Sequence, residues 1–158
     1  MDKNIIFLAK FSAIFIILTW VIEAIDLSFI QIPLTQITAG MAGLDFQGTN
    51  IFANDGIFAI TKFCTGILSS AILASIIFSL SKPELSKKAG IFLLGAIILF
   101  LANIIRVYFV LEIGKNYGIK MAETFHIISW FFTAAIIIIA WFYLTKKITK
   151  IENFSELL

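Results

Sequence analysis

Residues 61–80 read TKFCTGILSSAILASIIFSL. This stretch contains Cys64, the only cysteine of the chain, at the point where an irregular segment passes into the apolar run 67–80. We predict that the run is a membrane helix and that Cys64 stands at its entry. Because the run is short, Phe63, Cys64 and Thr65 are expected in its first turn.

The composition of the whole chain indicates a membrane protein of one domain. The 158 residues are 60% hydrophobic and only 14% charged, and the mean hydropathy is +1.01. A soluble fold of this size could not bury so much apolar surface, so the surrounding solvent must be lipid. The net charge of +2 is too small to argue for nucleic acid. A single cysteine excludes an internal disulfide, a paired-cysteine redox motif and a cysteine-based metal site.

The apolar runs predict an all-α integral membrane protein with four transmembrane helices. The expected spans are residues 5–22, 64–80, 91–111 and 126–144. The first run has no small-residue cleavage site after it, so it is expected to be a helix of the mature protein and not a signal peptide. Lysines follow a pattern that predicts both termini in the cytoplasm. Residues 81–89 are then a cytoplasmic loop, and residues 112–123 a polar outer loop.

The segment 23–63, between the first two spans, is predicted to lie outside the membrane on the outer side. Pro33 is expected to open a short helix there, since a proline lacks the N–H that would be unpaired at that position. Apolar residues then recur at helical spacing, namely Leu34, Ile37, Met41 and Leu44. Farther on, Asn54-Asp55-Gly56 is a strong turn signal between two short apolar runs, which predicts a small β-hairpin.

Three singular residues fall at one depth in this predicted topology. Cys64 begins a span entered from outside, Arg106, the only arginine, lies near the outer end of the third span, and His126, the only histidine, begins the fourth. We therefore predict that these residues meet near the outer membrane face and form a thiol-dependent active site.

Cys64 is the predicted nucleophile. A thiol at a helix N-terminus is favoured as thiolate by unpaired N–H groups and the helix dipole. The N–H groups around Thr65 and Gly66 would stabilise an oxyanion, and Gly66 would allow a substrate to approach the backbone closely. The competing interpretation is that Cys64 is an ordinary small buried residue.

Arg106 is expected to mark a site, because a lone arginine in an apolar helix is costly unless it is paired or reaches the interface. Asn103, three residues earlier on the same helical face, is expected to orient the guanidinium. Glu23 and Asp26 are either solvated anchors at the end of the first span or partners of Arg106.

His126 is the predicted acid or base. Glu123 precedes it by one helical turn and is expected to bond one ring nitrogen, which leaves the other for proton transfer. The alternative is an interfacial histidine with a satisfied ring.

Together these motifs resemble the exosortase/archaeosortase family. The resemblance rests on Phe63-Cys64-Thr65-Gly66-Ile67, then Asn103-Ile104-Ile105-Arg106-Val107, then His126, and it covers roughly residues 30–145. Members of this family are multi-pass membrane transpeptidases whose proposed catalytic residues are Cys, Arg and His in that order. This chain is shorter than many of them, so it looks like a compact member.

The resemblance implies a role in protein sorting at the outer face of the cell membrane. The substrates would be surface proteins with a C-terminal motif, a transmembrane helix and a basic tail. Cys64 would attack the peptide bond near the motif and form a thioester, His126 would protonate the leaving amine and activate the incoming nucleophile, and Arg106 would stabilise the oxyanion. The acceptor would be an amine-bearing lipid, another envelope component, or water.

Two non-enzymatic interpretations remain open. In a compact transporter, Arg106 or Glu23 would bind a charged solute, and Cys64 would be dispensable. In a structural membrane subunit, a partner protein would satisfy the polar residues. The sequence carries no recognisable motif for a metal or an organic cofactor, and it does not determine the oligomeric state.

Overall fold

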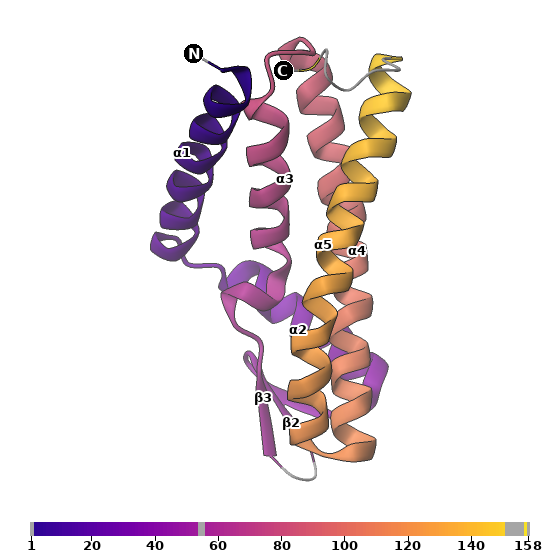
Figure 1. The fold of residues 1–158 in the computed structure, drawn as a ribbon. Coiled ribbons are helices and arrows are strands. Elements are labelled where there is room, and N and C mark those ends of the chain that lie inside the picture. Colours follow the sequence, from indigo (N-terminus) through magenta and orange to yellow (C-terminus); the bar gives the residue numbers. More distant parts are fainter. Residues whose placement is uncertain (1, 54–55, 151–156, 158) are drawn as a thin grey trace.

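The computed structural model describes residues 2–53, 56–150 and 157, and these are mostly helical. Helices α1 (Lys3–Ala24), α3 (Ile67–Ser79), α4 (Leu85–Tyr117) and α5 (Ile119–Thr149) pack side by side, with successive helices running in opposite directions (Figure 1). Within the described residues, α1, α4 and α5 are long and apolar enough to cross a membrane, whereas α3 is an apolar helix of 13 residues. This is the architecture of an all-α membrane protein.

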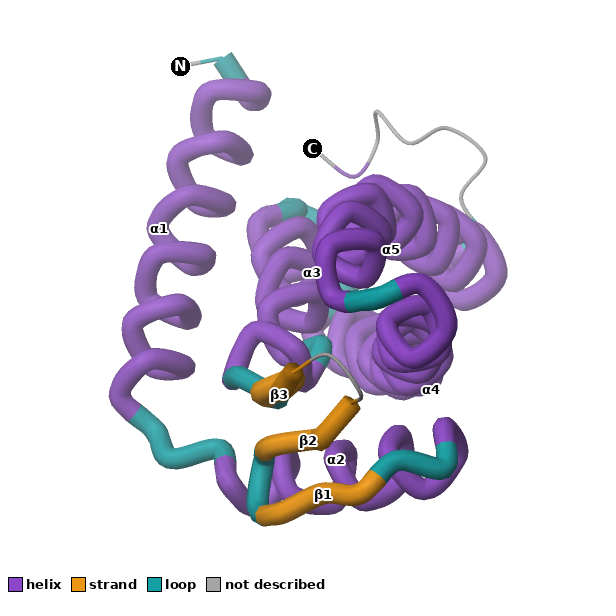
Figure 2. The backbone as a smooth tube through the Cα atoms, turned by 90° about the horizontal axis from the view of Figure 1, so that it is seen from below, coloured by secondary structure: helices purple, strands orange, loops and turns teal. Residues whose placement is uncertain are grey.

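A small cap connects α1 to α3 at the end of the bundle away from both termini (Figure 1). It consists of α2 (Ser28–Ala42), the strands β1 (Asp45–Gln47), β2 (Asn50–Ala53) and β3 (Gly56–Ala59), and the 3₁₀ helix η1 (Lys62–Thr65). The strands form an antiparallel sheet in the order β1-β2-β3. Seen from this end, β1 and β2 lie against α2, and β3 is the strand nearest α3 (Figure 2).

The predicted hairpin is confirmed, since β2 and β3 pair with Ala53 opposite Gly56. Asn54 and Asp55 of the predicted turn lie outside the described residues. Strand β1 was not predicted from the sequence. All three of its residues are exposed, so it has no alternation of apolar and polar residues that would reveal it in the sequence.

Helix α2 starts five residues before Pro33, so the predicted start at this proline is wrong. The Asp26 carboxylate accepts a hydrogen bond from the Ser28 N–H at 3.0 Å, one of the first N–H groups, which have no acceptor within the helix. This bond and one from the Ser28 hydroxyl hold the pKa of the exposed Asp26 carboxyl below its usual value.

The buried face of α2 also differs from the predicted stripe. Ile37 and Met41 are 48% and 52% exposed, and the residues facing the core are Leu34, Thr35, Thr38, Ala39 and Ala42. The two threonines can be buried because each hydroxyl donates to a carbonyl one turn earlier in the same helix, at 2.8 Å. Small and hydroxyl-bearing side chains thus place α2 close to α4.

Helices α4 and α5 are joined by Gly118 alone, and the predicted loop at residues 112–123 is wrong. Gly118 has φ +83°, a backbone conformation that glycine adopts without steric cost. With 33 and 31 residues, the two helices rise about 50 and 47 Å. A hydrocarbon core is about 30 Å thick. The polar residues of the predicted loop therefore continue the helices beside the cap, where Gly114 packs against Phe58.

Lysine side chains complete the ends of three helices. The Lys62 ammonium donates to the carbonyls of Glu23 and Ile25 at the end of α1, at 2.8 and 2.7 Å. Lys115 donates to the last carbonyl of α2 at 2.6 Å, and Lys88 donates to the carbonyl that follows α3. The last carbonyls of a helix have no partner within it, and a cation there also interacts favourably with the helix dipole.

Gly95 of α4 provides a test of how tightly the bundle is packed. A Cβ at this position would collide with Leu73 of α3 and touch Leu144 of α5. We expect Gly95→Leu to lower the thermal unfolding midpoint of the detergent-solubilised protein by several degrees, because overpacking costs about 1–3 kcal/mol. Gly90→Leu is the matched control in the same helix, since nothing lies within 4 Å of a Cβ there. Equal midpoints for the two variants would contradict this packing.

Candidate active site

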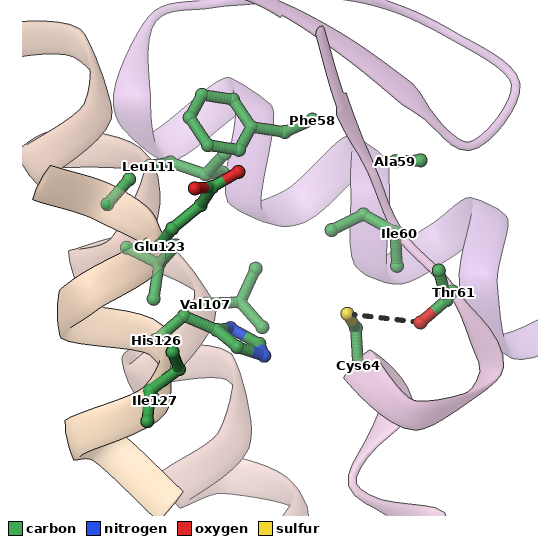
Figure 3. Close-up of a pocket in the computed structure, with 12 residues that line it drawn as sticks. Phe58, Ala59, Ile60, Thr61, Cys64, Val107, Leu111, Glu123, His126 and Ile127 are labelled. Atoms are coloured by element: carbon green, nitrogen blue, oxygen red, sulfur yellow. Dashed lines mark hydrogen bonds between the residues drawn. The ribbon is translucent and has the colours of Figure 1, made fainter. Parts of the chain in front are cut away.

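A cavity of about 440 Å³ lies between the β3–η1 segment and the α4–α5 pair. Cys64 and His126 line it from opposite sides, and the thiol and the imidazole face each other across it (Figure 3). Its walls are largely apolar, with Phe58, Val107 and Leu111 among the lining residues. Such a cavity has the size of pockets that bind small molecules or short peptide segments, about 300–1,000 Å³.

Cys64 lies in η1 and not in the first turn of a membrane helix, so this part of the prediction is wrong. Gly66, with φ +79°, separates η1 from α3, which begins at Ile67. The Cys64 N–H donates to the Thr61 carbonyl at 3.0 Å, and the thiol lies 3.4 Å from the Thr61 hydroxyl oxygen. The first-turn N–H groups of α3 therefore belong to residues beyond Gly66, and the expected helix-dipole effect on the thiol does not follow.

Asn103 is bonded to the cysteine segment and has a different role from the one predicted. Its side-chain amide donates to the carbonyl of Cys64 at 2.6 Å, whereas the prediction had it orient Arg106. A Cβ on Gly66 would lie 3.0 Å from the Cβ of Asn103. The absence of a side chain at Gly66 therefore allows Asn103 to come close to the backbone. The sequence analysis had predicted that a substrate would make this close approach.

Thr65 shapes the junction between η1 and α3. It is buried, and its hydroxyl donates to the Lys62 carbonyl at 2.6 Å. The same oxygen accepts the N–H of Ile67 at 3.4 Å. Thr65 thus pairs polar groups on both sides of the bend at Gly66, which holds the turn that presents Cys64.

Arg106 is buried, with 9% of its surface exposed. Its guanidinium carbon lies 4.9 Å from the centroid of the Trp130 ring. Its Nε and Nη1 atoms have no hydrogen-bond partner among the described residues. Unpaired donors on a buried cation are unfavourable, and an anion that reached them would stabilise them.

The acids predicted as possible partners of Arg106 do not pair with it in the described part of the chain. Glu23 and Asp26 are both exposed, and Asp26 is bonded to Ser28 at the start of α2.

His126 lies two turns inside α5 and is bonded to Trp130. The indole N–H of Trp130 donates to Nε2 of His126 at 3.4 Å, and the two rings meet edge to face at 6.2 Å. Glu123 lines the cavity as an exposed side chain, and no hydrogen bond joins it to His126 in the described structure. The predicted bond between Glu123 and His126 is therefore replaced by the bond from Trp130.

Trp130 is the site residue that the sequence analysis missed. It contacts both Arg106 and His126, and it lies four residues after His126 on the same helical face. Arg106 lies 12 positions before Gly118 and Trp130 12 positions after it, so both lie about 18 Å along their helices from the turn. This symmetry about Gly118 was available in the sequence, but only if α4 and α5 were known to meet without a loop.

The site combines a thiol, an imidazole and a guanidinium, which can act as nucleophile, proton carrier and anion stabiliser. Among the described residues, no group of three or more His, Cys, Asp or Glu side chains is placed to hold a metal ion.

Comparison with protein families gives a match. A family model described as transmembrane exosortase matches residues 3–143, a range that includes Cys64, Arg106 and His126. Neither the curated proteins nor the solved structures yield a significant match.

Because His126 is the only histidine, nitrogen NMR of the protein labelled with ¹⁵N-histidine observes a single ring. The Trp130 N–H donates to Nε2, so we expect the neutral ring to carry its proton on Nδ1. In Trp130→Phe the donor is lost and the aromatic ring is kept, and we expect the fraction protonated on Nε2 to increase. Trp20→Phe is the control, since Trp20 is 75% exposed on α1. An unchanged spectrum in Trp130→Phe would contradict the hydrogen bond.

Proposed function

The chain belongs to the transmembrane exosortase family, and from this premise we propose that it is a membrane-embedded cysteine transpeptidase. It cleaves the C-terminal sorting signals of surface proteins at the outer face of the cytoplasmic membrane and transfers them to an envelope acceptor. The observation that carries the proposal is the placement of Cys64 and His126 on opposite sides of one cavity (Figure 3). The buried Arg106 lies against Trp130, which is bonded to His126.

In the first half-reaction, the Cys64 thiolate attacks the carbonyl carbon of the scissile peptide bond. The carbon–sulfur bond forms, and the carbon–nitrogen bond breaks as His126 gives a proton to the leaving amine. The product is a thioester on Cys64. The cavity between thiol and imidazole provides the space for the peptide bond, which explains why the two side chains face each other without a direct hydrogen bond in the described structure.

In the second half-reaction, an amine of the acceptor attacks the thioester carbonyl. His126 takes the proton from the attacking nitrogen, the carbon–sulfur bond breaks, and the thiolate of Cys64 is regenerated. Water in place of the amine gives simple proteolysis. The surface protein is thereby joined to an amine-bearing lipid or to another envelope component.

Arg106 is proposed to stabilise the oxyanion that forms on the substrate carbonyl in both half-reactions. Its buried Nε and Nη1 atoms have no hydrogen-bond partner among the described residues, and such donors are stabilised by an acceptor that a bound substrate supplies. The face of Trp130 stabilises the cation through its π electrons and uses none of the guanidinium N–H groups.

We further propose that α1, α3, α4 and α5 are four membrane spans, with both termini in the cytoplasm and the cap outside. Alternating helix directions support this topology. With 13 residues, α3 rises about 20 Å, less than the thickness of a hydrocarbon core. The segment with Cys64 then lies partly within the membrane on the outer side, where the end of a substrate's own transmembrane helix can reach it.

Substitution of the three residues tests the catalytic proposal in cells that co-express a surface protein with a C-terminal helix and a basic tail. We expect Cys64→Ala to abolish a defined cleavage and His126→Asn to slow it by about 10²–10⁴-fold. Arg106→Lys keeps the charge but loses the planar donor geometry, and we expect a decrease of about 10²–10³-fold. Mass spectrometry of the substrate's new C-terminus measures the cleavage and identifies the acceptor.

The outcomes separate the enzyme from the non-enzymatic interpretations. A transporter predicts that Cys64→Ala has no effect while Arg106→Lys impairs function, and a structural subunit predicts that none of the three substitutions changes the substrate. Equal processing of a surface protein by wild type and Cys64→Ala would show that Cys64 is not the nucleophile.

Because Cys64 is the only cysteine, thiol labelling tests the orientation directly. We expect a membrane-impermeant methanethiosulfonate reagent to label Cys64 in intact cells, since the thiol lines a cavity at the outer side. The control is Lys82→Cys in a Cys64→Ala background, an exposed position beyond the opposite end of α3, which should be labelled only after permeabilisation. If Lys82→Cys were labelled in intact cells and Cys64 only after permeabilisation, the topology would be the opposite of the proposed one and the active site would not face outward.

A further inference from the structure

We propose that the free edge of β3 binds the polypeptide substrate in extended form, as an added strand whose main chain leads to Cys64. This inference rests on the proposed function and specifies how its substrate is held. It follows from the hydrogen-bond pattern of the small sheet and from the position of that sheet beside the cavity.

The outer edge of β3 carries unpaired main-chain groups. In the described structure β3 pairs with β2 on one side and with no strand on the other. The Ile60 N–H donates to the Thr49 carbonyl at 2.8 Å, so Ile60 and, two residues earlier, Phe58 direct their N–H groups toward β2. Along an antiparallel strand, residues whose main-chain groups face one neighbouring strand alternate with residues whose main-chain groups face the opposite side. The main-chain groups of Ile57 and Ala59 therefore point away from the sheet.

This edge borders the cavity. Phe58 and Ile60 direct their side chains into the cavity, whereas the side chain of Ala59 points away from it (Figure 3). Ala59 nevertheless lines the cavity, so it does so with its main chain. Ala59 is also exposed as a residue, and no hydrogen bond to its main-chain groups is found outside the sheet in the described structure.

The edge is short, but it lacks the charged side chains and prolines that normally hinder strand addition. Proteins protect exposed edges with charged side chains, prolines or covering elements. Strand β3 reads Gly56-Ile57-Phe58-Ala59, without a charge or a proline. An open pair of N–H and C=O groups at Ala59 is complementary to the main chain of an extended peptide, and this is how many domains bind peptide segments.

The position of the edge connects peptide binding to the chemistry. Beyond Ala59 the chain continues through Thr61, which also lines the cavity, to Cys64. A strand added along β3 would therefore run toward the thiol and place successive carbonyls along the wall that carries it. Alternate side chains of that strand would point toward the apolar wall formed by Phe58, Val107 and Leu111. The structure thus favours apolar residues at every second position of the bound segment.

Proline substitution tests the edge with a matched control in the same sheet. Ala59→Pro removes the outward N–H and places a ring where the added strand would lie, while an edge strand tolerates proline. Phe46 of β1 lies opposite Ile51 of β2. Since the main-chain groups of Ile51 face β3, Phe46 directs its own away from β2, at the far edge of the sheet. Phe46→Pro therefore makes the same change away from the cavity.

We expect Ala59→Pro to raise the KM for the polypeptide substrate about tenfold and to leave the rate of Cys64 alkylation by iodoacetamide unchanged. Phe46→Pro is expected to match wild type in both measurements. Wild-type processing by Ala59→Pro, or an equal loss in both proline variants, would overturn strand addition. If Cys64→Ala processes the substrate as well as wild type, the proposed function fails and this inference fails with it.

A second measurement does not depend on the folding of any variant. Synthetic peptides spanning the cleavage site, each with one N-methylated amide, are presented to the wild-type protein in detergent. Strand addition predicts inhibition of cleavage at alternate positions, because only every second amide of an added strand faces β3. Uniform tolerance, or sensitivity without alternation, would contradict the proposal even if Ala59→Pro is inactive.

Discussion

The hydrogen bond from the Asn103 amide to the carbonyl of Cys64, 2.6 Å long, is the interaction on which the site depends. The chain around Cys64 is neither α-helix nor sheet, and such backbone in an apolar environment needs partners for its polar groups. Asn103 supplies one from α4, and Gly66 permits the approach because it has no Cβ. Since Arg106 follows Asn103 by one helical turn, the same contact places the guanidinium beside the cysteine segment.

Other side chains hold the segment from the remaining directions. Gln31 of α2 donates to the carbonyl of Ile60 at 2.7 Å, and Lys62 ties η1 to the end of α1. Each donor satisfies a carbonyl that regular secondary structure leaves unpaired. The irregular segment is thus fixed by polar contacts to α1, α2 and α4, which allows a thiol to be presented at the wall of an apolar cavity without a regular helix or strand beneath it.

Trp130 gives the two basic side chains distinct environments. Its ring face lies against the Arg106 guanidinium, and its N–H is bonded to the His126 imidazole. A carboxylate in the same place would pair with Arg106 and occupy the donors that an oxyanion needs. An indole stabilises the cation with its π electrons and orients the imidazole with its single donor. One aromatic residue can therefore position both groups and leave Nε and Nη1 of Arg106 without a partner.

By itself, the sequence determined the features that depend on short segments. Hydropathy identified the long apolar helices and the shorter run of α3, and Asn54-Asp55-Gly56 indicated the hairpin. The singular Cys64 and His126 pointed to two residues that line one cavity. Only the tertiary structure decided the partners of these residues. It placed Cys64 in η1, joined α4 to α5 at Gly118, directed Asn103 to Cys64 and introduced Trp130 between Arg106 and His126. The physical reason is that hydropathy and turn preference act over a few neighbouring residues. A hydrogen bond between residues 64 and 103 depends on how closely two helices pack, and no local pattern records that distance.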